Sequence, residues 1–205
     1  MRQHRFASHT PDELRRLSNL GHIMEGLLFG GVGILALLDS LGMAAWASIA
    51  WPLLIIIAGV LLLLLLYPFH PLGDWPAIWR DPQQREHTII AVAIALAGGA
   101  ELLRRANANW ASGWPVALLI VGGLFLTHAQ HGTSAAAAKA VRRHRILGAT
   151  IIVAGLLRVA ALAGGGIMFG VLWSLVLLLA ALQLFLYREP EGAYETGHGH
   201  GGHGV

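Results

Sequence analysis

The sequence predicts an all-α fold, a polytopic membrane helix bundle with about six transmembrane helices. Of its 205 residues, 56% are hydrophobic and only 12% are charged, whereas soluble domains carry roughly 25% charged residues. Six apolar stretches are each long enough to cross the hydrocarbon core of a bilayer, which takes about 20 helical residues. They are continuous runs of Leu, Ile, Ala and Val without the alternation of barrel strands, so we expect helices.

The predicted spans form one transmembrane domain over residues 21–188, followed by a flexible Gly/His-rich tail over residues 189–205. The spans lie near residues 21–40, 48–68, 87–104, 114–131, 146–163 and 167–187. Residues 1–20 are expected to form a cytoplasmic, interfacial amphipathic segment. A helix is expected to start there at Thr10-Pro11-Asp12-Glu13, which reads as an N-cap, a proline and two acids. This polar segment does not resemble a signal peptide, so the first apolar run is expected to be a span.

Basic residues indicate how the spans are oriented. If the spans alternate, most Lys and Arg residues fall on one side, in the N-terminal segment, the second-to-third connection and the fourth-to-fifth connection. Such an excess marks the cytoplasmic side, so we expect a protein of the bacterial inner membrane with both termini in the cytoplasm. The formal net charge of +3 is explained by anionic lipid headgroups, and no nucleic-acid partner is expected.

Two halves of the chain resemble each other. The segment from His87 to Glu101 can be laid over the segment from His144 to Arg158, with a histidine first and an ionisable residue fourteen positions later in each. An apolar stretch that ends in histidine precedes each segment, so the predicted unit is helix, His, loop, His, helix. Glu101 and Arg158 are expected to pair across two helices near the opposite face, with a role in a conduction pathway as the alternative.

Six of the eleven histidines are expected at one face of the membrane. His22, His87 and His144 begin predicted spans, whereas His70, His128 and His131 lie at the ends of spans. His22 and Glu25 are three residues apart, as are His128 and His131, so each pair shares one helix face. Neutral imidazole suits copper, iron, nickel or zinc, and a carboxylate can join it. The candidate metal ligands are therefore His22, Glu25, His70, His87, His128, His131 and His144.

The alternative for any single histidine is an amphipathic ring at the bilayer surface. Glu25 is a stronger candidate for function, because an ionisable group within a span is expensive. The Gly/His-rich tail is expected to capture divalent metals weakly or to have no function. The chain has no cysteine, which excludes disulfides, thiolate ligands and a cysteine nucleophile.

Short motifs around the histidines resemble the membrane domain of the copper-resistance protein D family. They are His70-Pro71-Leu72-Gly73-Asp74-Trp75, then His87, then Leu126-Thr127-His128-Ala129-Gln130-His131, then His144. The resemblance covers roughly residues 60 to 160. It implies a multi-span protein that moves or tolerates copper, with His70, His128, His131 and His144 as candidate copper ligands.

Three other functions stay open at this point. A b-type cytochrome would use two of the histidines as axial heme ligands. A membrane oxidoreductase would hold a di-iron or di-copper centre. An accessory subunit of a larger membrane complex would bind protein partners and need no metal. The sequence shows no nucleophilic triad and no phosphate-binding loop, and it leaves open whether the protein is an enzyme.

Overall fold

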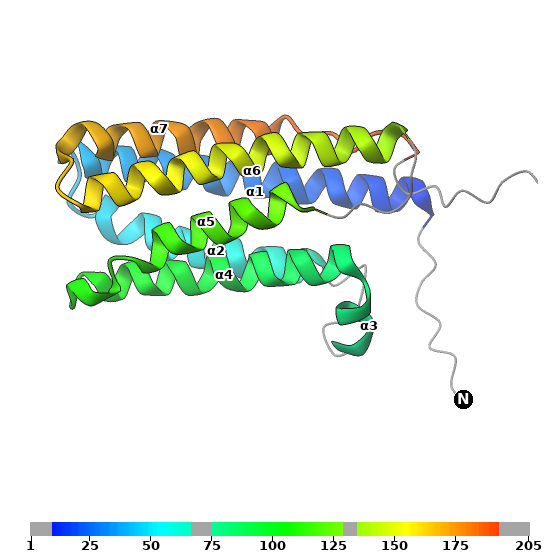
Figure 1. Cartoon of the computed structure of the whole chain (residues 1–205), viewed down its shortest axis with the longest axis horizontal. Coiled ribbons are helices and arrows are strands. Elements are labelled where there is room, and N and C mark those ends of the chain that lie inside the picture. Colours follow the sequence, from blue (N-terminus) through cyan, green and yellow to red (C-terminus); the bar gives the residue numbers. More distant parts are fainter. Residues whose placement is uncertain (1–9, 67–74, 129–134, 193–205) are drawn as a thin grey trace, which may run out of the picture.

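The fold is a bundle of six long helices that run roughly antiparallel along one axis (Figure 1). The computed structural model describes residues 10–66, 75–128 and 135–192. The long helices are α1 (Pro11–Ser40), α2 (Ala47–Leu66), α4 (Pro82–Arg104), α5 (Gly113–Leu126), α6 (Ala135–Leu162) and α7 (Gly166–Phe185). Helix α3 (Trp75–Arg80) and the 3-10 turn η1 (Ala108–Trp110) are short.

Within the described residues, six segments are long and apolar enough to cross a membrane, with η1 and α5 together forming the fourth. The predicted all-α class and the six spans are therefore confirmed. Two helices extend further than the apolar runs that predicted them. Helix α1 begins at Pro11 and continues without a break to Ser40, so residues 11–20 are its first turns. Helix α6 begins at Ala135, because an alanine-rich run of high helix propensity precedes its apolar part.

The start of α1 is fixed by a capping box. The Thr10 hydroxyl accepts a hydrogen bond from the backbone N–H of Glu13, and the Glu13 carboxylate accepts one from the backbone N–H of Thr10. These two bonds satisfy donors that the first helical turn leaves without a partner. The helix start predicted from the sequence is therefore confirmed.

The six long helices form a closed ring. Each packs against the next long helix in the chain, and α7 packs against α1 to close the circle. Residues of all six helices line a cavity of about 120 Å³ in the middle of this ring. Every long helix therefore contributes residues to the lining of the same central cavity.

Three pairs of adjacent helices repeat the same pattern around this ring: α2 with α4, α5 with α6, and α7 with α1. The first helix of each pair carries a tryptophan, at Trp51, Trp114 and Trp173. The second helix carries a histidine followed eleven residues later by a glycine, at His87 and Gly98, His144 and Gly155, and His22 and Gly33. The sequence predicted a repeat between the first two of these helix pairs from the segments that begin at His87 and His144, and the structure adds the shared tryptophan and a third pair that joins the last helix to the first.

The three glycines make equivalent close contacts. A Cβ atom on Gly98 would lie 2.7 Å from the side chain of Ile56, and one on Gly33 would lie 2.7 Å from Leu178. A Cβ atom on Gly155 would lie 3.3 Å from Leu119. Ile56, Leu119 and Leu178 each follow the tryptophan of their unit by five residues. The repeat is therefore one of packing as well as of sequence, since small residues let helices approach closely in lipid.

We expect Gly98→Ala to destabilise the protein and Gly99→Ala to leave it unchanged or more stable. A Cβ atom on Gly98 would also lie 2.7 Å from the Pro52 carbonyl oxygen, whereas one on Gly99 has no neighbour within 4 Å. Overpacking costs about 1–3 kcal/mol, while alanine in an open helix position gains up to about 1 kcal/mol over glycine. Thermal unfolding of the two purified variants measures the difference, and equal melting temperatures would contradict this packing.

The end of the bundle opposite the histidines is closed by a layer of aromatic and charged side chains. The Trp51 ring centroid lies 6.0 Å from that of Trp114 and 5.6 Å from that of Trp173. Arg158 Nη2 lies 2.9 Å from Glu101 Oε1, which confirms the predicted ion pair. The Arg158 guanidinium also lies 4.9 Å from the centroid of the Trp173 ring. Buried tryptophans and a paired charge thus close this end of the bundle, and Trp114 of this layer also lines the central cavity.

Candidate metal centre

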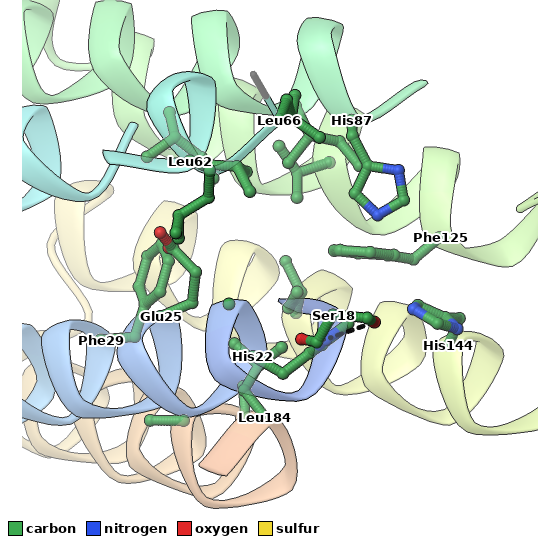
Figure 2. A pocket seen from close by; sticks show the side chains of 18 of the residues that line it. Ser18, His22, Glu25, Phe29, Leu62, Leu66, His87, Phe125, His144 and Leu184 are labelled. Atoms are coloured by element: carbon green, nitrogen blue, oxygen red, sulfur yellow. Dashed lines mark hydrogen bonds between the residues drawn. The ribbon is translucent and has the colours of Figure 1, made fainter. Parts of the chain in front are cut away.

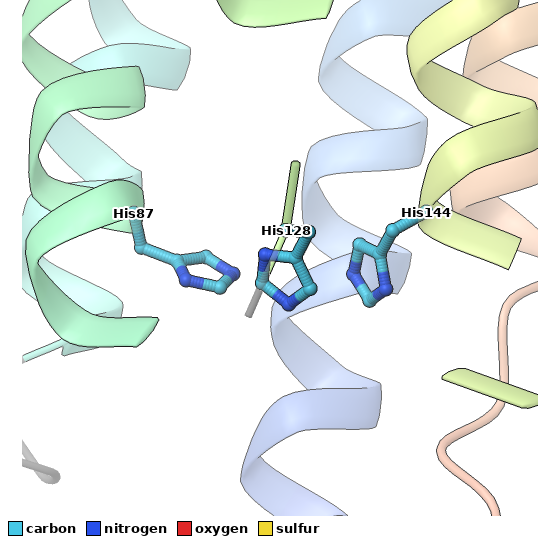
Figure 3. Close-up of side chains that lie close together, drawn as sticks. All are labelled: His87, His128 and His144. Atoms are coloured by element: carbon cyan, nitrogen blue, oxygen red, sulfur yellow. The ribbon is translucent and has the colours of Figure 1, made fainter. Parts of the chain in front are cut away.

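Three histidines from three parts of the ring meet at one end of the bundle. His87 lies in the second turn of α4, His128 follows the end of α5, and His144 lies in α6. One ring nitrogen from each can be chosen so that all three lie within 4.8 Å of one another. Figure 3 shows the three rings in a row, with His128 between His87 and His144. Three neighbouring imidazoles can serve as ligands for one transition-metal ion.

The Nδ1 atom of each of these rings has a partner outside the group. In His87 it lies 2.8 Å from the Gln83 carbonyl oxygen, and in His144 it lies 2.9 Å from the Ala140 carbonyl oxygen. In His128 it lies 3.0 Å from Glu86 Oε2. In His87 and His144, a Nδ1–H that donates to the carbonyl oxygen leaves the lone pair on Nε2, which is how metal-binding histidines are usually held.

Burial strengthens the case for a bound ion at this position. His128 and His144 are 4% and 3% exposed, and Nε2 of His144 has no hydrogen-bond partner among the described residues. A buried polar atom without a partner costs free energy. A metal ion that accepts the lone pair of this nitrogen would remove that cost.

In this structure the three histidine rings do not all direct a nitrogen toward one common point. His128 and His144 stack with their centroids 4.2 Å apart and their planes 27° apart, while His87 meets His128 edge to face at 5.3 Å. Because an imidazole binds a metal in the plane of its ring, two stacked rings cannot both point at one ion. His128 lies beyond the last helical residue of α5, so its rotation is the adjustment that disturbs the helices least.

A fourth histidine stands beside the group. The His22 ring centroid lies 5.7 Å from that of His144, and its Nδ1 lies 2.7 Å from the Ser18 carbonyl oxygen. The Tyr187 ring stacks on it at 4.2 Å. Tyr187 follows Trp173 by fourteen residues, as His128 follows Trp114, so a tyrosine occupies in the third unit the place that a histidine holds in the second.

Glu189 fixes the segment after α7 against α1. Its carboxylate accepts hydrogen bonds from the hydroxyls of Ser18 and Tyr187, and its backbone N–H donates to the Asn19 side chain. Burial raises the pKa of Glu189 above its usual value, although the two hydroxyls and Arg143 oppose this by favouring the charged form. These bonds hold Tyr187 over His22.

The seven predicted ligands therefore have different outcomes. His87, His128 and His144 come together, and His22 lies next to them. Glu25 lines the central cavity and is not part of the three-histidine group. His70 and His131 lie outside the described residues. Two contributors had not been predicted, Glu86 and Tyr187, and only the place of Tyr187 in the third repeat unit could have pointed to it.

The central cavity extends from the histidines to the tryptophan layer. Its lining includes His22, His87 and His144 at one end and Trp114 at the other. Figure 2 shows Glu25 and Phe29 along α1, further from His144 than His22 is. The histidine group therefore stands at one end of an interior space with mainly apolar walls.

Comparison of the chain with protein-family models, with curated proteins and with solved structures finds no match.

Proposed function

We propose that this chain is an integral membrane protein that binds copper through His87, His128 and His144, for capture or transfer of the ion at one membrane face. The observation that carries the proposal is the set of three imidazoles whose ligand atoms lie within 4.8 Å, each with its Nδ1 atom engaged elsewhere. Imidazole nitrogen is a ligand that suits copper. The resemblance of the histidine motifs to the copper-resistance protein D family supports the same ion.

The charge around the site favours monovalent copper. The three imidazoles are neutral when they bind a metal, and Glu86 Oε2 lies within ion-pairing distance of His128 Nδ1. A buried charge is stabilised when a single opposite charge accompanies it, and any further charge is costly. The single positive charge of Cu(I) would be balanced by the single negative charge of the Glu86 carboxylate.

A bare ion fits this geometry better than heme or a di-iron centre. Heme iron sits between two axial ligands on opposite faces of a porphyrin, and His128 and His144, with centroids 4.2 Å apart, are too close to each other to serve as that pair. Di-iron centres in helix bundles use several bridging carboxylates. An arrangement of three histidines with a single neighbouring carboxylate favours neither.

Basic residues favour the cytoplasm for the histidine end of the bundle. Arg142 and Arg143 precede His144 in α6, and Arg15 and Arg16 begin α1 at the same end. Cytoplasmic loops carry an excess of such residues. We therefore place the site at the cytoplasmic face of a bacterial inner membrane.

We expect the purified full-length protein to retain one equivalent of copper. The histidines of the tail, His198, His200 and His203, are first changed to glutamine so that they cannot contribute. The protein is then loaded with Cu(I) under reducing conditions, excess ion is removed, and copper per chain is measured by atomic absorption. A preparation that retains no copper, or that carries a Soret absorbance band as isolated, would contradict the proposal.

A further inference from the structure

Glu25 is a buried carboxylate without a visible structural purpose. It is 6% exposed, and neither of its oxygens has a hydrogen-bond partner among the described residues. It lines the central cavity together with Phe29, the next cavity residue along α1. Burial of a carboxylate without a partner is expensive, so a ligand that supplies the missing hydrogen bond would be stabilised here.

The repeat shows that packing does not require a carboxylate at this position. Glu25 follows His22 by three residues, and the equivalent residues after His87 and His144 are Ile90 and Leu147. Both of these are buried aliphatic side chains. Helix α1 therefore differs from α4 and α6 at this position, where it carries a carboxylate that lines the cavity in place of an aliphatic side chain.

The size and walls of the cavity define the kind of ligand. Its volume of about 120 Å³ is close to the roughly 150 Å³ of an apolar cavity that binds benzene. The walls of the cavity are mainly aromatic or aliphatic, with Phe29, Leu62, Ile90 and Phe125 among them. Such a space accepts one apolar ring, while the carboxylate accepts a hydrogen bond from one donor.

We propose that the cavity is a second binding site, for a small lipid-soluble phenol whose ring lies among the apolar walls and whose hydroxyl donates a hydrogen bond to Glu25. A hydroxyl brings one donor, which a carboxylate can satisfy. An ammonium group would bring three donors to a part of the cavity that offers one carboxylate. The cavity shares His87 and His144 with the three-histidine group, but the proposed hydrogen bond is made to Glu25 and does not depend on a bound metal.

The test uses p-cresol and toluene, which share a methylated ring and differ by one hydroxyl. Binding to the full-length protein in lipid nanodiscs is measured by titration calorimetry, with a copper chelator present. We expect the wild type to bind p-cresol about 2- to 10-fold more tightly than toluene, the range for a hydrogen bond between neutral groups. In Glu25→Leu this preference should vanish while toluene binding is kept, and Glu25→Gln should retain part of the preference.

Each other outcome would overturn the proposal. Absence of binding, or equal affinity of the wild type for the two probes, removes the phenol site. A preference that persists in Glu25→Leu removes the role of Glu25. Tighter binding of benzylamine than of p-cresol, lost in Glu25→Leu, would assign the site to cations instead. Both variants are chosen so that the protein should still fold. Glu25→Leu introduces an aliphatic residue like those at the equivalent repeat positions, and Glu25→Gln keeps the shape of the side chain.

Discussion

Replacement of His144 by alanine is expected to lower the affinity of the protein for Cu(I) by more than about 100-fold. Removal of the group that accepts a hydrogen bond from a metal-binding histidine already lowers metal affinity by about 10- to 100-fold. Removal of the histidine itself should lower the affinity further. His144 stacks on His128 and is 3% exposed, so no water can easily take its place. Competition with a colorimetric Cu(I) chelator, in the background without tail histidines, gives the affinity.

Two further variants separate a three-histidine site from a loose histidine cluster. Glu86→Gln keeps all ligands but weakens the contact of Glu86 with Nδ1 of His128, and we expect a loss of about 10- to 100-fold. His22→Ala removes a ring that lies beside His144 but is not part of the group. It should change the affinity by less than about tenfold, the lower limit of such indirect effects. Equal losses for His22→Ala and His144→Ala would contradict the assignment of the ligands.

The sequence was sufficient for the fold class because composition and span length are properties of local segments. The six spans, the capped start of α1 at Thr10, and the pairing of Glu101 with Arg158 were all predicted from such patterns and are found in the structure. The end of the bundle that carries the histidines followed from alternation of the spans alone. Apart from the ion pair, which joins α4 and α6 and was expected from matching positions in the two repeat segments, these features need no knowledge of which helices are neighbours.

The features that were not predicted depend on how the ring closes. The third repeat unit joins α7 to α1, which are the two ends of the chain, so a comparison of consecutive segments could not reveal it. The same closure brings Tyr187 onto His22 and separates Glu25 from the three-histidine group. Spacing of three residues places Glu25 and His22 on one helix face, but it does not decide which neighbouring helices each side chain meets.

The second large effect is expected at the opposite end of the bundle, where Glu101→Leu should cost about 3–5 kcal/mol of stability, the range for a buried ion pair that loses one partner. Glu101 is fully buried, and Arg158 is 9% exposed. Without Glu101, Arg158 keeps its contacts with the ring faces of Trp51 and Trp173, worth about 1–2 kcal/mol. Denaturant titration in detergent measures the free energy of unfolding.

The two partners of this pair should not be equivalent. In Arg158→Leu the Glu101 carboxylate keeps Arg104, whose Nε lies 2.7 Å from Oε1, so this variant should lose less stability than Glu101→Leu. The double variant Glu101→Leu/Arg158→Leu removes both charges and should recover much of the loss, because an apolar pair often replaces a buried ion pair at little cost. Arg104→Leu, at a partly exposed position, should cost at most about 1 kcal/mol. If the two single losses simply add in the double variant, the charges do not interact, and the closure of this end then rests on the tryptophan layer alone.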